Sequence, residues 1–414
     1  MLEKNYLLNS PLFLSELKKL YGDNCDIDAL ASRYSNLSKG LNGSLYLFSS
    51  PGRAELIGNH TDHNHGLVLA TSINMDNAAC VEKTDDNLIT ICSAGFTPFT
   101  VDINSIEIDK SKYGTSEALL KGVVKGFLNY NYKVGGFKAN IDSNIFKGAG
   151  VSSSAAFELL LCEILNCLYN DGKIDYITKA IISRYSENVY FGKPSGLMDQ
   201  LTISRGGVSF MNFKKKIPTS KSVPWSLKDT SLIIINCGGD HCNLTDEYAS
   251  IREDMNNISK FFGKKVLASV KESDFYENIT ALKEKYTGRA ILRAMHFFDE
   301  NKRVKLAVNA LNKGKEKKFL SLICDSGFSS YMLLQNCFPT GDKEQPVTLA
   351  LGIVSHDART IAYRVHGGGF AGTILCFVSD NNADSYVSTM KTIFGNENVF
   401  MVKSRDYGAI EVKY

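Results

Sequence analysis

The chain has 414 residues, of which 44% are hydrophobic, so it can bury sizeable cores in two or three domains. Its 47 basic and 44 acidic residues give a formal net charge of +3, which disfavours nucleic acid or an anionic membrane as a partner and favours small ligands. The 10 cysteines form no Cys-x-x-Cys pair, as is typical of free thiols. Because no apolar run could span a bilayer and the amino terminus has no signal-like pattern, we expect a cytoplasmic protein.

The predicted secondary structure mixes helices and strands along the chain. Strands are predicted where short apolar or β-branched runs occur, at residues 45–48, 77–81, 88–92, 232–235 and 373–378. Helices are predicted where apolar residues recur with helical spacing, over residues 13–20, 116–128, 154–169, 246–262 and 290–311. The chain therefore belongs to a mixed α and β class.

A change in composition marks a candidate domain boundary. Three lysines at 214–216 and two of only eight prolines, Pro218 and Pro224, fall close together. Charge and proline in combination are typical of an exposed linker. We therefore predict a first domain over residues 1–217 and a second over residues 226–414.

Residues 50–66, Ser-Pro-Gly-Arg-Ala-Glu-Leu-Ile-Gly-Asn-His-Thr-Asp-His-Asn-His-Gly, form the most informative segment. Their dense hydrogen-bond donors and acceptors are suited to gripping a polyhydroxylated molecule such as a sugar. A polar surface turn is an alternative, since Gly, Asn and Asp accumulate in turns. A metal site at His60, His63 and His65 is another, because imidazole is a common metal ligand.

A second segment, Lys-Gly-Ala-Gly-Val-Ser-Ser-Ser-Ala-Ala at residues 147–156, stands directly before a predicted helix. Glycines let the backbone approach an anion and a helix amino terminus offers unpaired N–H groups, so we predict a phosphate site. The serines can cap the helix, bond phosphate oxygens or ligate Mg²⁺. No Gly-Lys-Ser/Thr ends the segment, so it is not a Walker loop. The predicted phosphate-binding residues are Gly148, Ala149, Gly150, Val151, Ser152, Ser153, Ser154 and Ala155.

Two further segments combine glycine with polar residues. Residues 366–372, His-Gly-Gly-Gly-Phe-Ala-Gly, match Gly-x-Gly-x-x-Gly by spacing but lead into a predicted strand, which favours a tight loop over a dinucleotide site. Residues 193–200, Lys-Pro-Ser-Gly-Leu-Met-Asp-Gln, place Asp199 just beyond a proline and a glycine. An isolated aspartate after a turn is more often structural than catalytic.

In order and approximate spacing, these four segments resemble the glycine-rich motifs and the catalytic-aspartate segment of the GHMP small-molecule kinases, and among them of the galactokinases. The run from Gly196 to Gln200 carries the resemblance most strongly. It implies an α+β fold with a ribosomal-protein-S5-like amino-terminal domain, a ferredoxin-like carboxy-terminal domain that carries the glycine-rich loop 367–372, and an active-site cleft between them. It also implies a sugar 1-kinase that uses ATP and Mg²⁺. We further expect a monomer or weak homo-oligomer.

The resemblance assigns roles to individual residues. Asp199 would accept or orient the proton of the sugar's anomeric hydroxyl, and Arg53 would stabilise that carboxylate and the developing charge. Ser153 or Ser154 would ligate Mg²⁺ together with Glu187. The residues that would hold the sugar are Asn59, His60, Asp62, Gly196 and Tyr248.

The sugar segment departs from the family pattern. Galactokinases usually read Gly-Arg-Val-Asn-Leu-Ile-Gly-Glu-His-Thr-Asp-Tyr, whereas this chain has Glu55, Asn59 and His63 at the Asn, Glu and Tyr positions. In the family the glutamate faces the C6 end of the sugar. An amide there no longer repels a carboxylate, so galacturonate becomes an alternative to galactose. A sugar sensor without kinase activity is an alternative of another class, disfavoured because the serine run of the phosphate loop is intact.

Overall fold

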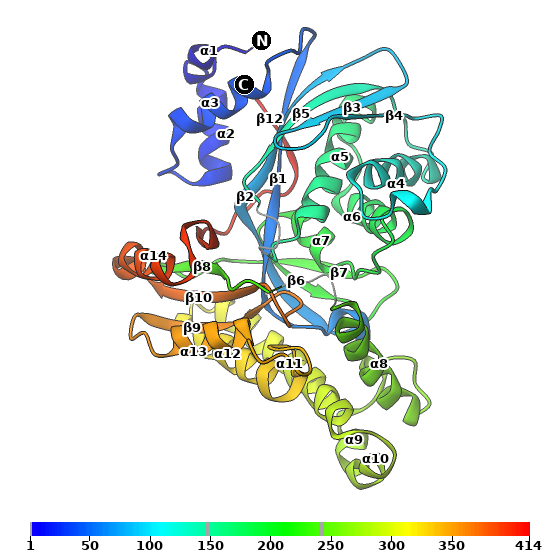
Figure 1. The fold of residues 1–414 in the computed structure, drawn as a ribbon, viewed down its shortest axis with the longest axis vertical. Coiled ribbons are helices and arrows are strands. Elements are labelled where there is room, and N and C mark those ends of the chain that lie inside the picture. The colour runs from blue at the N-terminus through cyan, green and yellow to red at the C-terminus, as the bar shows by residue number, and fades with distance from the viewer. Residues whose placement is uncertain (1, 146–149, 240–243) are drawn as a thin grey trace.

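Two long antiparallel strands, β1 (Leu45–Ile57) and β2 (Leu67–Lys83), form the centre of the larger sheet (Figure 1). The computed structural model describes residues 2–145, 150–239 and 244–414. Within these ranges the larger sheet has the order β12-β1-β2-β5-β3-β4, with β6 paired to β2 and β7 paired to β6. Its other strands are β3 (Leu88–Ser93), β4 (Phe99–Asp102), β5 (Phe137–Ser143), β6 (Val208–Asn212), β7 (Thr219–Val223) and β12 (Ile410–Val412).

Helices cover both faces of this sheet. Phe48 and Ala79 point into the core that contains α5, whereas Leu47 and Ala78 pack against α2 and α3, as the alternation of side chains along a strand requires. The helices of this half are α1 (Lys4–Leu8), α2 (Pro11–Tyr21), α3 (Ile27–Leu37), α4 (Ser116–Asn129), α5 (Ser153–Tyr169), α6 (Tyr176–Tyr185) and α7 (Met198–Arg205), and a π-helical turn, Ser186–Tyr190, continues α6.

Local sequence signals account for several of these helices. Ser10 caps α2 by accepting a hydrogen bond from the backbone N–H of Phe13, and Pro11 occupies the first turn, where its missing N–H costs nothing. Asp26 caps α3 in the same way. Helix α5 is apolar around most of its circumference, which explains why it is buried between the sheet and the neighbouring helices.

The smaller sheet is antiparallel and has the order β11-β8-β10-β9. Its strands are β8 (Thr230–Asn236), β9 (Thr360–His366), β10 (Thr373–Ser379) and β11 (Val399–Val402). The helices of this half are α8 (Thr245–Phe261), α9 (Glu272–Glu277), α10 (Ile279–Lys285), α11 (Gly288–Asn312), α12 (Glu316–Ser329), α13 (Pro346–Ser355) and α14 (Asp380–Phe394), and a π-helical turn, Ser330–Leu334, continues α12. The chain order of one strand, helices, two strands, helix and strand is that of a ferredoxin-like unit, so the predicted α+β class is confirmed.

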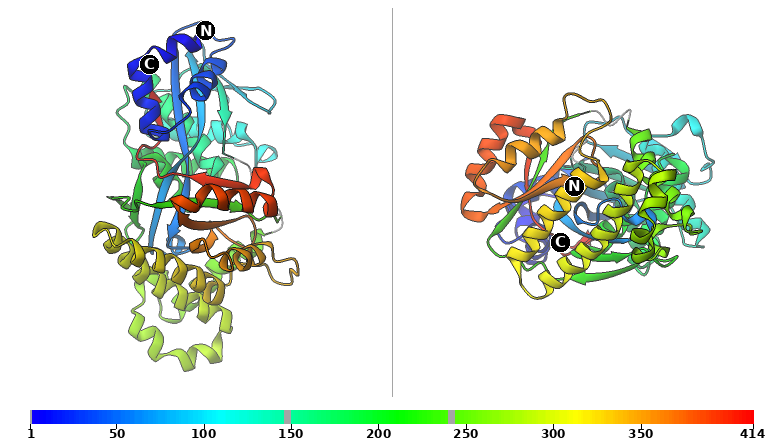
Figure 2. Two further views of the ribbon diagram at one scale, coloured as in Figure 1. Left: turned by 90° about the vertical axis from the view of Figure 1, so that its left-hand side faces the viewer. Right: turned by 90° about the horizontal axis from the view of Figure 1, so that it is seen from below.

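Two segments that follow the first predicted domain also contribute strands to the larger sheet. Strand β7 lies within the segment that we predicted as the boundary, and it pairs with β6 in the larger sheet. The last strand, β12, returns to the larger sheet and pairs with β1. As a result the two termini lie close together at one end of the molecule (Figures 1 and 2). The division into residues 1–217 and 226–414 stays a prediction.

Each predicted helix and strand lies on an observed element of the same type. The observed strands are longer than predicted, because polar residues continue the ladders beyond the apolar runs. The run at 45–48 is only the start of β1, which extends through Arg53 and Glu55.

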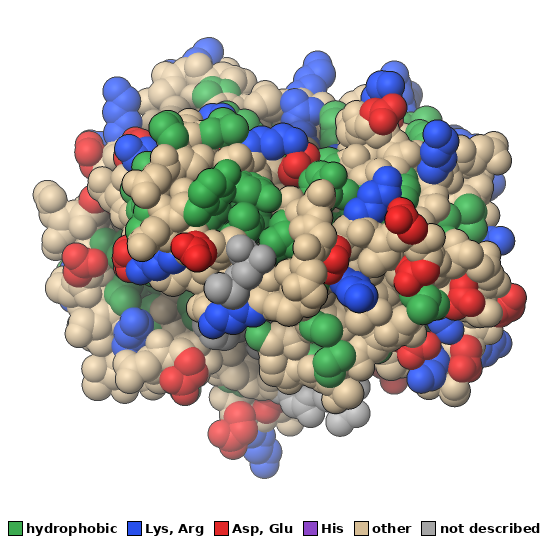
Figure 3. All heavy atoms as spheres, turned by 90° about the horizontal axis from the view of Figure 1, so that it is seen from above, with side chains coloured by type: hydrophobic (Ala, Val, Ile, Leu, Met, Phe, Trp, Pro, Cys, Tyr) green, Lys and Arg blue, Asp and Glu red, His purple; other side chains and the backbone are tan. Residues whose placement is uncertain are grey.

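Charged residues of both signs are interspersed on the face shown in Figure 3, in keeping with the near-neutral composition. In the described parts of the chain, no helix combines the length and the apolar character that crossing a membrane requires.

Candidate active site

The sugar segment is divided between strand β1 and the loop that joins it to β2. Arg53 and Glu55 lie in β1, and both are buried, as are Asn59 and Thr61 in the loop. Gly58 has a φ of 118°, and a Cβ there would lie 2.6 Å from the Cα of Val68, so the turn requires glycine. The alternative of a polar surface turn is therefore wrong for this segment.

Arg53 and Ser152 both bond the carboxylate of Asp199. The Nε of Arg53 donates to Oδ1 of Asp199 at 2.8 Å, and the hydroxyl of Ser152 donates to Oδ2. Arg53 also donates to the carbonyl of Gly150 in the phosphate loop. Loss of solvent works to raise the pKa of Asp199, but the Arg53 charge and these hydrogen bonds together hold it below the ordinary 3.8. The carboxylate is therefore ionised at neutral pH.

The phosphate loop enters helix α5 directly after Ser152. Gly148 and Ala149 lie outside the described residues. Ser152 adopts a left-handed conformation with a φ of 63° and caps no N–H of the helix, because its hydroxyl bonds Asp199 instead. Ser153 is exposed in the first helical turn. The sequence allowed these serines to cap the helix, but Ser152 does not do so.

Ser154 and Glu187, two of the three candidate Mg²⁺ ligands, are in contact. The Ser154 hydroxyl donates to Oε1 of Glu187 at 2.9 Å, and Lys193 approaches the same oxygen at 3.1 Å. Gln200 donates to Oε2 at 2.8 Å. A hydroxyl and a carboxylate beside a phosphate loop are ligands that Mg²⁺ accepts when substrate phosphates supply the rest, so these residues fit the metal.

The final glycine-rich loop accepts hydrogen bonds from three of the predicted sugar residues. The carbonyls of Gly367, Gly368 and Gly369 are bonded in turn by Asn59 Nδ2 at 2.7 Å, His60 Nε2 at 2.8 Å and Tyr248 Oη at 2.9 Å. A Cβ on Gly368 would lie 2.6 Å from the Tyr248 ring, so a side chain there would push the tyrosine away. The loop thus joins strand β9 to the sugar segment and to helix α8.

The same loop also lies against the phosphate loop. A Cβ on Gly150 would come within 2.4 Å of the hydroxyl of Thr373, the first residue of β10. The carbonyl of Gly150 would lie 3.5 Å from a Cβ on Gly367. These close approaches bring the sugar segment, the phosphate loop and the final glycine loop to one place.

Asp62 and Gly196 meet across the site. A Cβ on Gly196 would lie only 2.0 Å from Oδ2 of Asp62, so any larger residue would displace the carboxylate. Loss of solvent is the main cause that raises the pKa of Asp62 to about 6. Loss of solvent likewise lowers the pKa of His60 to about 4. His60 is therefore a neutral hydrogen-bonding ring at neutral pH, whereas Asp62 is mostly ionised.

Asn59 differs from the other predicted sugar residues because its side chain is completely buried and bonded within the protein. Its Nδ2 donates to Glu55 and to the Gly367 carbonyl, and its Oδ1 accepts from Asn336 at 2.8 Å and from Ser330 at 3.3 Å. The idea that Asn59 faces C6 of the sugar stays a prediction, and these contacts argue against it.

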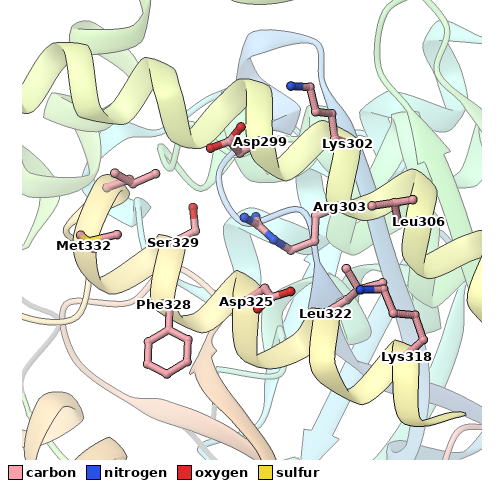
Figure 4. A pocket seen from close by; sticks show the side chains of 11 residues that line it. Asp299, Lys302, Arg303, Leu306, Lys318, Leu322, Asp325, Phe328, Ser329 and Met332 are labelled. Atoms are coloured by element: carbon pink, nitrogen blue, oxygen red, sulfur yellow. The ribbon is translucent and has the colours of Figure 1, made fainter.

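The alternative of a histidine metal site receives no support from the described residues, in which no group of three or more His, Cys, Asp or Glu could hold a metal ion. A surface groove of about 430 Å³ lies between α11 and α12, and none of the predicted site residues lines it (Figure 4). The candidate site is therefore identified by the contacts among its side chains and loops and not by this groove.

Comparison with known proteins finds family signatures over most of the residues that form this site. The galactokinase galactose-binding signature matches residues 39–83, and the GHMP kinases N terminal domain matches residues 118–207. A galactokinase of Clostridium tetani is 31% identical over 346 residues, which cover 83% of this chain and 86% of the relative. A galactokinase of Actinobacillus pleuropneumoniae is 31% identical over 345 residues, covering 81% of this chain and 85% of the relative.

The chain belongs to the galactokinase family. The fold agrees: the crystal structure of Lactococcus lactis galactokinase complexed with galactose has a TM-score of 0.79 at 22% identity, covering 93% of this chain and 100% of that one. The Methanococcus jannaschii mevalonate kinase has a TM-score of 0.62 at 16% identity, covering 88% and 99%. The predicted GHMP kinase fold is confirmed, and the protein is an ATP-dependent sugar kinase.

Several residues around the site carried no sequence signal. His296 and Glu300 of α11 hold the loop after β1, because His296 Nε2 bonds the Asn59 carbonyl at 2.9 Å and Glu300 accepts from the Gly58 N–H at 2.9 Å. Asn336 bonds both Asn59 and the Gly368 carbonyl. None of the three lies in a motif. Lys193 was inside a motif, and its contact with Glu187 depends on tertiary structure that spacing does not reveal.

Proposed function

We propose that this kinase transfers the γ-phosphoryl group of ATP to the anomeric hydroxyl of galactose, giving galactose 1-phosphate and ADP. The observation that carries the proposal is the Asp199 carboxylate, held by Arg53 and Ser152 between the sugar segment and the phosphate loop. The relatives named galactokinase supply the choice of sugar.

In the proposed step the anomeric oxygen forms a bond to the γ-phosphorus while the bond to the β,γ-bridging oxygen breaks, and the hydroxyl proton passes to Asp199. A carboxylate with a lowered pKa is a weak base. Its proton transfer therefore becomes favourable only late, when bond formation has made the hydroxyl acidic. Asp199 would thus act mainly by orienting the hydroxyl, and Arg53 by holding Asp199 and offsetting the developing charge.

The nucleotide would be held by the segment from Gly148 to Ala155 at the amino terminus of α5, whose unpaired N–H groups and dipole favour phosphate. Glu187 and Ser153 or Ser154 would hold Mg²⁺, and the contact between Ser154 and Glu187 supports this set. When bound, the metal would neutralise charge on the β- and γ-phosphate oxygens.

His60, Asp62, Gly196 and Tyr248 would hold the sugar hydroxyls. Support comes from their clustering: Asp62 contacts Gly196, and the rings of His60 and Tyr248 stack with centroids 6.4 Å apart. A neutral imidazole, a phenol and a carboxylate together supply the hydrogen-bond donors and acceptors that the hydroxyl groups of an uncharged sugar require. We also propose a cytoplasmic monomer or weak homo-oligomer, and the free thiols support the cytoplasmic location.

A coupled assay of ADP release tests the proposal. Galactose, galacturonate, N-acetylgalactosamine, glucose and arabinose are each offered with ATP, with and without Mg²⁺. We expect Mg²⁺-dependent turnover with galactose to exceed that with the other sugars. Preference for galacturonate would overturn the choice of substrate, and binding of galactose without turnover would favour a sensor.

A further inference from the structure

Glu55 and Asn59 form a buried pair that reverses the order of the family motif. The motif has Asn at the first of these positions and Glu at the second, and this chain has Glu and then Asn. The two side chains are in contact, with Nδ2 of Asn59 donating to Oε1 of Glu55 at 2.9 Å. This chain therefore has one carboxylate and one amide at these two positions, as the motif does, but their positions are exchanged. The two side chains form one hydrogen-bonded pair.

Glu55 provides the counter-charge for a buried arginine. The guanidinium of Arg364 lies 3.4 Å from Oε1 of Glu55, and Arg364 is completely buried. Arg364 also donates to the carbonyl of Leu56 at 2.7 Å, and the backbone N–H of Glu55 donates to Nε2 of His366 at 3.1 Å. A buried cation left without its anion is strongly destabilising. The carboxylate at position 55 thus attaches the end of β1 to strand β9.

Asn59 attaches the next turn of the chain to the glycine loop. A side-chain amide has two donor hydrogens and two acceptor lone pairs. The donors of Asn59 go to Glu55 and the Gly367 carbonyl, and its acceptor is bonded by Asn336 and Ser330. The full hydrogen-bonding capacity of this amide is therefore used inside the protein.

We propose that Glu55 and Asn59 are an exchanged positioning pair, which sets the places of His60 and of the glycine loop and does not select the substituent at C6. His60 follows Asn59 directly and bonds the next carbonyl of the same loop, that of Gly368. A shift of Asn59 would be passed to a sugar-holding ring through one peptide unit and through the loop.

The pair also removes the reason for expecting galacturonate. That alternative depended on position 59 no longer carrying a carboxylate that repels galacturonate, but the carboxylate of Glu55 lies 2.9 Å from the Asn59 amide. The amide itself has no hydrogen-bonding group left for a ligand. Two of the nearby cations are engaged, since Arg364 lies against Glu55 and Arg53 bonds Asp199. The carboxylate of a galacturonate would meet Asp62, which is mostly ionised at neutral pH and repels it.

A double-mutant cycle tests the exchange. The variants are Asn59→Glu, Glu55→Asn and the double variant with both changes, which restores the family order. The melting temperature and the KM values for galactose and ATP are measured for each. Glu163→Gln is the control, because Glu163 is a buried carboxylate paired with Lys179 away from the site.

The two single variants should each lower the melting temperature and raise the galactose KM about tenfold, with a smaller effect on the ATP KM. In Asn59→Glu two carboxylates would face each other, and in Glu55→Asn Arg364 would lose its anion. The double variant should recover most of both losses. The control should lower the melting temperature without changing the galactose KM. If a single variant does not fold, soluble expression of the double variant is the measure of recovery.

Additive losses in the double variant would overturn the exchange. A wild-type preference for galacturonate, lost in Asn59→Glu, would overturn the positioning role, because it would mean that the amide faces C6. The kinetic part of the test rests on the proposed function. The melting temperatures do not, so the pair is tested even if neither sugar is a substrate.

Discussion

Arg53 joins Asp199 to the phosphate loop, since one guanidinium donates both to the Asp199 carboxylate and to the Gly150 carbonyl. Ser152, two residues beyond Gly150, bonds the other oxygen of the same carboxylate. Any movement of the loop on binding a nucleotide would therefore reach Asp199 directly. This arrangement couples the position of the proposed base to that of the phosphate loop.

Asp199→Asn tests the catalytic role of this carboxylate. The amide keeps the shape but loses the charge and the ability to accept the proton, so kcat should fall by about two orders of magnitude or more. The galactose KM should change little. Turnover within a few-fold of wild type, measured at saturating ATP and galactose, would contradict the role of Asp199.

Asp62 predicts an acid limb in the pH profile. Its pKa is raised to about 6, so it gains a proton as the pH falls through that value, whereas Asp199, with a lowered pKa, stays ionised. Because Asp62 is proposed to hold the sugar, kcat/KM for galactose should fall below about pH 6 while kcat at saturating sugar falls less. Asp62→Asn should abolish the limb. A limb unchanged in that variant would mean that another group titrates, Glu55 being the first candidate because burial raises its pKa to about 7.

Much of the site could be predicted from the sequence because its residues lie in short segments with distinctive chemistry. Arg53, Ser152 and Asp199 were singled out from segments about fifty to one hundred residues apart, and the structure brings them within hydrogen-bonding distance. The spacing of the motifs could not predict which hydrogen-bond partner each side chain has in the folded protein. Ser152 looked like a phosphate ligand or a cap, and its bond to Asp199 depends on the left-handed backbone at that residue.

The partners of Asn59 could be predicted from the sequence even less well. Its family position suggested contact with C6 of the sugar, but its partners Ser330 and Asn336 come from a π-helical turn and a loop nearly three hundred residues later. Neither partner lies in a recognisable motif. In contrast, the ferredoxin-like half followed from the resemblance, and two of its strands, β8 and β10, were visible as continuous apolar runs.

Glu187→Gln tests the metal and nucleotide side of the site. The amide is a poorer ligand for Mg²⁺ and no longer balances Lys193, so the Mg²⁺ concentration needed for half-maximal rate should rise about tenfold or more. Binding of Mg·ATP, followed by calorimetry without sugar, should weaken in parallel. Ser154→Ala should act in the same direction with a smaller effect. An equal rise in the galactose KM would indicate that both changes act through the fold alone.

Gly196→Ala tests the contact with Asp62. The added methyl group would lie 2.0 Å from the Asp62 carboxylate, which must then move. A misplacement of about 1 Å in a binding group can cost about a hundredfold in rate, so kcat/KM for galactose should fall steeply while the ATP KM stays near wild type. Gly352→Ala is the matched control, because a Cβ there meets nothing within 4 Å. Equal kinetics in the two variants would contradict the placement of Gly196 in the sugar site.

Asp76→Asn tests what holds the two termini to the larger sheet. Asp76 is completely buried and accepts from Arg33 at 2.7 Å and from Tyr21 at 2.6 Å, with Arg405 at 3.7 Å. Removing the anion leaves the completely buried guanidinium of Arg405 without a carboxylate partner, although Arg33 keeps Asp142 at 2.6 Å. The free energy of unfolding should therefore fall by about 3–5 kcal/mol. The galactose KM should not change, because the cluster is remote from the residues proposed to hold the sugar.

The pH dependence of this loss follows from the pKa of Asp76. Burial works to raise that pKa, but Arg33 and Arg405 hold it below the ordinary 3.8, so folding is favoured by ionisation. This stability is fully present above pH 3.8 and is lost as the pH falls through the lower folded value. The difference in melting temperature between wild type and Asp76→Asn should therefore be constant near neutral pH and shrink below pH 3.8. A difference that stays constant down to lower pH would show that the carboxylate is not the group that stabilises the cluster.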